Sequence, residues 1–229
     1  IALFFVTSTE ARKELSSEDF DVYRALTGQM STVLQNRRLL EQTAATLDET
    51  RRLYAASRAI AGALDTETVY DIAAQYLNLA NAPVTRLSFL ASNVPTQFAA
   101  YVEYSFIFTR STAHTSDIDV GMRIPSTLVP FAEMLHDTRS VAFNSSADFA
   151  QHPALLALLQ RSGSRSGALV SIQSRQQWFG VMMVESDQVM AFDESYLRFA
   201  QAVGDQVAIA VESLRLFAEA QQQAQRALA

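Results

Sequence analysis

The chain has 229 residues, of which 49% are hydrophobic and 18% are charged, and its formal net charge is -6. This composition is that of a globular protein with one full domain and additional segments, and it excludes a disordered or low-complexity chain. The acidic balance disfavours nucleic-acid binding, and the absence of cysteine excludes disulfides, thiolate zinc sites, cysteine nucleophiles and thioether-linked chromophores.

The chain opens on a short apolar segment, residues 1–6, which lacks a basic region and does not begin with Met. This segment is far shorter than the ~20 residues that span a membrane, and it differs from a signal peptide. We therefore expect a piece of a longer cytoplasmic protein that contacts neither membranes nor nucleic acids.

An internal repeat links the two ends of the chain. ALFFVTS and the helical segment after it resemble GVMMVES and the helix after it, with Gln29 aligned to Gln206. Duplication explains the shared order of apolar strand, acidic helix cap and amphipathic helix better than chance does. We infer that residues 1–45 are the closing strand and helix of one module, and that residues 52–217 form a second module.

Between the two copies, residues 16–64 are predicted to form one long connecting helix, capped by Ser16 or Ser17. Apolar residues recur in it every seven positions, and one domain cannot cover such a stripe. We therefore expect a parallel homodimer joined along this helix and along the closing helix. The expected interface consists of Leu26, Val33, Leu40, Leu47, Tyr54, Val203, Ala210, Leu214 and Phe217.

The second module reads as an α+β domain: a helix, two strands, a helical and irregular middle, two or three further strands and a closing helix. Asp65 and Thr66 cap its first helix, and the apolar run WFGVMMVES indicates a central strand covered on both faces. Alternation in the second strand places Tyr104, Phe106 and Phe108 on one face. The predicted helices are 67–80, 126–136, 152–159 and 194–226, and the predicted strands are 85–91, 98–109, 141–143, 168–172 and 178–186.

These segments resemble a GAF domain, a sensory module of signalling proteins. The resemblance is carried by LYAASRAIAGALDTETVYDIAAQYL, GMRIP, the stretch from VPFAEMLHD to SGALVSI, and WFGVMMVES with the helix after it. It covers residues 52–217, it makes residues 1–45 the tail of a preceding GAF domain, and it leaves residues 218–229 as a helical extension. It implies a six-stranded antiparallel sheet of GAF/PAS-like form, a ligand pocket between the sheet and the irregular middle segments, and helices that dimerise.

Departures from the family pattern exclude the cysteine-dependent functions of GAF domains. Bilin-binding relatives and the free methionine sulfoxide reductases of the family use cysteine, which this chain lacks. The pattern of cyclic-nucleotide-binding GAF domains is not recognisable either. The resemblance by itself implies no chemistry.

A ligand pocket is expected between the sheet face that bears Phe106 and Phe108 and the segment 123–149. The aromatic residues also suit an ordinary core, and the loop RSGSRSG runs from helix into strand, the wrong direction for a phosphate loop. The candidate ligand-binding residues are Phe89, Phe106, Phe108, Arg123, Phe131, His136, Phe143, Asp148, Arg165 and Ser166.

No residue set indicates catalysis. Ser166, His136 and Asp148 could compose a triad, but no motif marks the serine as a nucleophile. The three histidines lack metal-site spacing, so no metal and no cofactor is assigned, with a haem ligand as the alternative left open. We expect a non-catalytic sensory module that acts with neighbouring signalling domains; the alternative is a structural dimerisation and relay domain whose pocket is filled.

Overall fold

The computed structural model describes residues 16–78, 84–92, 94, 99–110, 118–129, 131–144, 152–175, 177–189 and 192–228. The chain divides into two compact units, Ile1–Arg51 and Arg52–Ala229. The strand predicted near the start of the chain lies outside the described residues.

Helix α1, Ser17–Ala61, begins in the first unit and ends in the second. Its start is a reciprocal cap: the Ser16 hydroxyl accepts from the Asp19 amide at 3.2 Å, and the Asp19 carboxylate accepts from the Ser16 amide at 2.9 Å. The large apolar side chains of the seven-residue stripe are exposed, with 50% for Leu26, 65% for Val33 and 71% for Leu40. The long helix is thus confirmed, and its stripe is exposed in the part of the chain that the structure describes.

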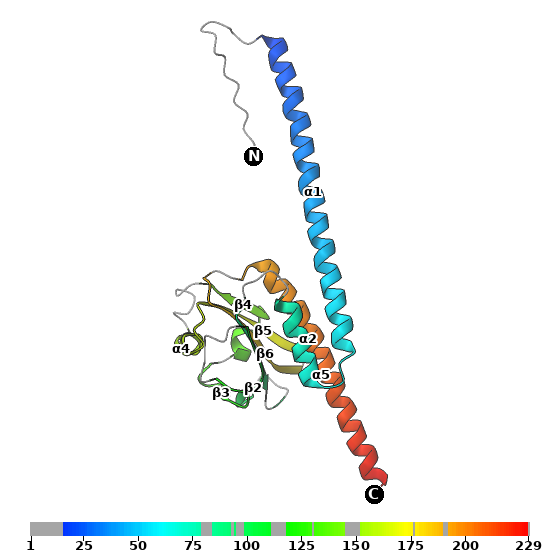
Figure 1. Cartoon of the computed structure of the whole chain (residues 1–229), viewed down its shortest axis with the longest axis vertical. Coiled ribbons are helices and arrows are strands. Elements are labelled where there is room, and N and C mark those ends of the chain that lie inside the picture. Colours follow the sequence, from blue (N-terminus) through cyan, green and yellow to red (C-terminus); the bar gives the residue numbers. More distant parts are fainter. Residues whose placement is uncertain are drawn as a thin grey trace. The chain divides into compact units, whose positions relative to one another are not determined.

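The second unit is built on a six-stranded antiparallel sheet, which confirms the expected fold class (Figure 1). The strand order is β3-β2-β1-β6-β5-β4, so the apolar β6 is central, as its composition predicts. The strands are β1 Arg86–Ser92, β2 Tyr101–Thr109, β3 Arg123–Pro125, β4 Ser140–Phe143, β5 Ser166–Ser174 and β6 Gln177–Ser186.

Helices α2, Thr66–Asn78, and α5, Glu194–Leu228, cover one face of the sheet (Figure 1). Asp65 caps α2 by accepting from the Thr68 amide at 2.7 Å, and Asp193 caps α5 in the same way. Between helices and sheet lies a core that we call the helix-side core. Its members include Ile60, Leu77, Leu87, Phe89, Val170, Met182, Phe199 and Val203.

The opposite face of the sheet is covered by α3, Phe131–Met134, by α4, Pro153–Arg161, and by the segments around residues 118–129. The resulting second core, the loop-side core, includes Leu90, Tyr104, Phe131, Leu135, Phe143, Leu155, Trp178 and Met183. The two cores account for a sheet that is buried on both faces, as the continuous apolar run of β6 requires.

On this side one predicted element is corrected and one element is new. The helix expected over 126–136 is reduced to α3, because Pro130 disfavours the helical conformation in the residue before it, and Leu128 and Val129 instead form turns on the Pro125 carbonyl. The three-residue strand β3 was not predicted, since it is too short to show alternation.

The strand β2 corrects a further prediction. Phe89 of β1 pairs with Phe106, but its neighbour Leu90 pairs with Tyr104, so Ser105 is an extra residue in the ladder. This bulge reverses the alternation. Phe106 therefore faces the helix-side core and Tyr104 the loop-side core, whereas the sequence pattern placed them on one face.

Candidate functional site

A buried charged pair lies on the loop-side face of the sheet. Arg86 of β1 and Glu185 of β6 are opposite each other in the ladder, and their side chains are only 6% and 0% exposed. The Arg86 Nε and a Glu185 carboxylate oxygen are 3.6 Å apart. Charged side chains are almost never buried this deeply unless they are paired, so the pair is a specific feature of the two central strands.

Hydrogen bonds tie this pair to the loops that cover it. The hydroxyls of Ser162 and Ser164, which follow α4, donate to Glu185, the second of them at 3.1 Å. The Arg86 guanidinium donates to the Ile118 carbonyl at 3.2 Å. The pair thus joins two central strands to two covering segments of the loop-side core.

The electrostatics follow from burial. Loss of water raises the pKa of Glu185, and the hydrogen bond from Ser162 and the charge of Arg86 partly oppose that shift. Burial also raises the pKa of the nearby Tyr104 hydroxyl, and the Glu185 charge adds to it. The Tyr104 hydroxyl has no hydrogen-bond partner within the described part of the chain. This cluster can hold a polar group or a charge in an apolar setting, but it presents no nucleophile with a base beside it.

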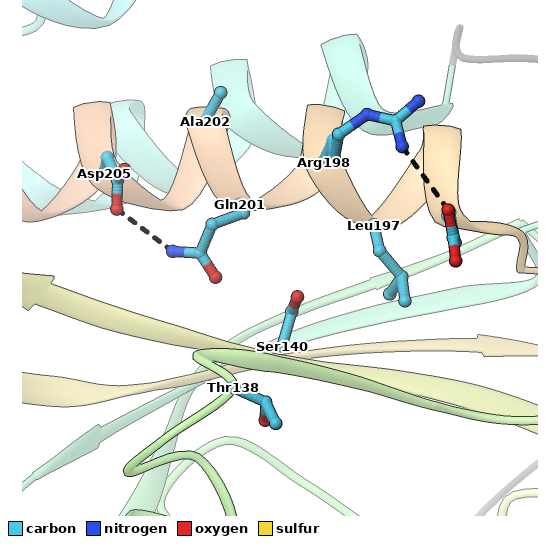
Figure 2. Close-up of a pocket in the computed structure, with 8 residues that line it drawn as sticks. Thr138, Ser140, Leu197, Arg198, Gln201, Ala202 and Asp205 are labelled. Atoms are coloured by element: carbon cyan, nitrogen blue, oxygen red, sulfur yellow. Dashed lines mark hydrogen bonds and ion pairs between the residues drawn. The ribbon is translucent and has the colours of Figure 1, made fainter.

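A second feature lies on the other face, where α5 passes over the β4 end of the sheet (Figure 2). A cavity of about 510 Å³ opens there. Leu197 and Gln201 point from α5 toward the sheet, and Ser140 points toward them (Figure 2). The remaining lining residues are Thr138, Glu194, Arg198, Ala202 and Asp205.

The cavity is bordered by a network that links three elements. Arg139, in the turn before β4, donates to Asp205 of α5 at 2.6 Å. Gln201 donates to Asp205 at 3.0 Å (Figure 2). Its side-chain amide also donates to the Ser171 carbonyl of β5 at 3.5 Å. The Ser171 amide in turn donates to the Arg139 carbonyl at 2.7 Å. Helix α5 is thereby connected by polar contacts to the sheet that it covers.

The candidate aromatic residues are divided between the two faces. Phe89, Phe106 and Phe108 pack on the helix side, where the Phe89 ring stacks on Tyr70 at 4.3 Å between centroids. Phe131 and Phe143 pack in the loop-side core. The pocket face expected from Phe106 and Phe108 is thus corrected: these rings face α2 and α5, not the segment 123–149.

The polar candidates are also apart. Arg123 is exposed and pairs with Glu103 at 2.8 Å, and His136 is exposed in the turn after α3. Arg165 is exposed, and the buried Ser166 donates to the Gln188 carbonyl at 2.7 Å. Asp148 lies outside the described residues. The structure therefore does not gather these residues in one place, and ligand binding by any of them stays a prediction.

Sequence reasoning missed Arg86, Glu185, Arg139 and Asp205. A signal existed for the first two, because each is a charged residue within an apolar strand. No local signal marks the Arg139–Asp205 pair, whose members are far apart in the sequence. In the described ranges no group of three or more His, Asp and Glu could hold a metal ion. Among the described residues, moreover, no helix is both long enough and apolar enough to cross a membrane.

Comparison with known proteins supports this architecture. A family model described as GAF domain matches residues 38–211, more than half of the chain. A comparison with curated protein sequences finds no match.

Solved structures resemble the fold at low sequence identity. The chromophore-binding domain of a bacteriophytochrome from R. palustris has a TM-score of 0.60 and 12% identity over 74% of this chain, which spans only 62% of that domain. The GAF domain of a sensor histidine kinase from Bacillus halodurans has a TM-score of 0.51 and 18% identity, over 68% of this chain and 99% of that one. A free methionine-R-sulfoxide reductase from Neisseria meningitidis has a TM-score of 0.56 and 15% identity, over 73% and 90%.

Proposed function

Because the chain belongs to the GAF domain family, the sensory modules of signalling proteins, we propose that it is a non-catalytic regulatory module that relays a conformational signal through dimeric helices. In this proposal, a small molecule held by the module, or the state of a neighbouring domain, sets the conformation of the sheet. Helices α1 and α5 carry that change onward.

The proposal rests on α5, which is buried over its first half and exposed in its last turns. Its first half supplies buried side chains to the helix-side core, among them Phe199, Val203 and Val207. Its last turns are exposed, with Leu216 at 51% and Phe217 at 63%. One end of this rigid helix is packed in the helix-side core and the other end is exposed. A shift of the core therefore moves the exposed end and whatever contacts it.

The contacts of α5 with the sheet are suited to such a relay. The polar network of Arg139, Gln201, Asp205 and Ser171 fixes the helix to β5 and to the turn before β4. Gly204 lets α5 approach β5 closely, because a Cβ there would lie 3.1 Å from the Val170 side chain. Close packing of this kind transmits small displacements instead of absorbing them.

The proposed dimer interface follows the uncovered stripe of α1 and the exposed part of α5. Val203 is fully buried in its own chain and leaves no surface for a second one, so the contribution of α5 begins further along, at Ala210, Leu214 and Phe217. An exposed stripe of large apolar residues is an aggregation hazard, and a second copy carries the same stripe to cover it.

The alternative function, a structural relay whose pocket is filled, is favoured by a different observation. The loop-side core, where the family resemblance implies a ligand, contains Tyr104, Phe131, Leu135 and Leu155 at 2% exposure or less. Side chains of this size occupy much of the space that a ligand would need. In this version the module senses only its neighbours.

Two measurements test the proposal. Light scattering on the 229-residue chain should give the mass of a dimer at high micromolar concentration. Leu40→Asp with Leu47→Asp should shift it to a monomer while the second unit stays folded, whereas Gln35→Asp with Gln42→Asp, on the other side of the same helix, should leave the dimer intact. A monomer mass for the unmodified chain would refute the dimeric relay.

Mass spectrometry of small molecules that co-purify with the chain separates the two versions of the function. A compound bound in stoichiometric amount supports the ligand-binding module. A dimer that carries no compound, and that none stabilises in a ligand screen, supports the filled-pocket relay.

A further inference from the structure

A second cavity, of about 570 Å³, lies between α5 and the end of β5, on the face of the sheet opposite the Arg86–Glu185 pair. Its volume is within the range of small-molecule sites, about 300–1,000 Å³. Its lining comes from three elements: the turn before β4, the β5 end that leads to the β5–β6 turn, and one side of α5. The lining residues are Arg139, Gln173, Ser174, Arg175, Asp205, Ile209, Glu212, Ser213 and Leu216.

In this cavity the carboxylates have hydrogen-bond partners, whereas some of the arginine donors do not. Both carboxylates are occupied: Asp205 accepts from Arg139 and Gln201, and Glu212 accepts from the Ser174 hydroxyl at 2.6 Å. The Arg139 Nε, in contrast, is buried and has no hydrogen-bond partner among the described residues. The Arg175 side chain makes no hydrogen bond or ion pair with the described residues, and both arginines adopt left-handed backbone conformations, with φ of 58° and 47°. Hydrogen-bond donors are therefore in surplus.

We propose that this cavity binds a small ligand that carries a compact oxyanion, a carboxylate or a phosphate, on an apolar body. The guanidinium of Arg139 uses one N–H on Asp205, so it has other donors to offer to an oxyanion, and Arg175 supplies a second positive charge. Ile209 and Leu216 of α5, 52% and 51% exposed, form an apolar wall for the body of the ligand.

Binding of an oxyanion has a direct consequence for α5. The ligand competes with Asp205 for the Arg139 guanidinium, so occupancy weakens one of the polar contacts between α5 and the turn before β4. A small anion bound at this site would thus change how α5 is held to the sheet without entering the loop-side core. Binding at this cavity requires neither dimerisation nor a ligand in that core.

The test is a calorimetric titration of the 229-residue chain with benzoate, phenyl phosphate and inorganic phosphate. We expect saturable binding of benzoate or phenyl phosphate, weakened by added salt because exposed charges are screened. Stronger binding of one of the two identifies the preferred oxyanion. Inorganic phosphate binding as tightly as phenyl phosphate would overturn the role of the apolar wall.

Variants assign the binding to this cavity. Arg175→Gln should weaken it about tenfold, the size expected for loss of one charge-assisted hydrogen bond. Arg198→Gln, which lines the neighbouring cavity on the same helix, is the matched control and should leave the affinity unchanged. Asp205→Asn removes the competitor and should tighten binding.

Two results would overturn the site: no saturable binding of any probe at millimolar concentration, or equal losses of affinity for Arg175→Gln and Arg198→Gln. Unchanged affinity in Asp205→Asn would overturn the competition between Asp205 and the ligand.

Discussion

Removal of one member of the Arg86–Glu185 pair should destabilise the second unit more than removal of both. In the Arg86→Met variant, the Glu185 carboxylate stays in a core position with 0% exposure and loses its charge partner. The hydrogen bonds from Ser162 and Ser164 remain, but they do not replace a full positive charge. Breaking a buried ion pair in this way costs about 3–5 kcal/mol.

The double variant Arg86→Met with Glu185→Leu leaves no buried charge behind. The Ser162 hydroxyl oxygen lies 2.8 Å from the Leu159 carbonyl oxygen, so its single proton still has an acceptor after the loss of Glu185. Replacement of a buried ion pair by apolar residues of similar volume is often neutral, or stabilising by about 1–4 kcal/mol. We therefore expect the double variant to be at least about 2 kcal/mol more stable than the single one.

Urea denaturation followed by tryptophan fluorescence measures these differences. Trp178 is the single tryptophan of the chain and is 4% exposed in the loop-side core, so its emission reports unfolding of the unit that holds the pair. Equal destabilisation in the single and double variants would refute the reasoning, because it would show that packing, not the unpaired charge, sets the cost.

Burial raises the pKa of Glu185 above its ordinary value of 4.5, so the folded state binds this proton more tightly than the unfolded state does. The corresponding stability is fully present below pH 4.5 and is lost as the pH rises through the raised folded pKa. Glu185→Gln should remove this pH dependence in denaturation curves, and a slope identical to that of the unmodified chain would contradict it. Gly180 has a φ of 147°, and a Cβ there would lie 2.0 Å from the Leu90 carbonyl oxygen, so Gly180→Ala should cost at least about 3 kcal/mol. Gly121→Ala is its control: the φ is 89° but no atom lies within 4 Å, so thermal unfolding should show a loss of only about 1 kcal/mol. His136→Ala should change the free energy of unfolding by less than about 0.5 kcal/mol, since that side chain is 61% exposed; a larger loss would give this residue a structural role.

Local pattern alone determined the helices α1, α2, α4 and α5, the central strand and the α+β class. The seven-residue repeat and the cap at Ser16 predict α1, and the apolar run of β6 predicts a strand that is buried on both faces. These features depend on neighbours in the sequence, for which periodicity and capping preferences are sufficient evidence. The short β3 and the reduced helix α3 escaped because elements of three or four residues are too short for a period to show.

Only the tertiary structure decided which side chains meet. The bulge at Ser105 sends Phe106 to the helix-side core and Tyr104 to the loop-side core, and it arises from the pairing of β2 with β1, which no window of the sequence contains. The contact between Arg139 and Asp205 likewise depends on how α5 lies over the end of the sheet. Faces and ion pairs of this kind are set by register and by helix placement, which long-range packing determines after the local elements have formed.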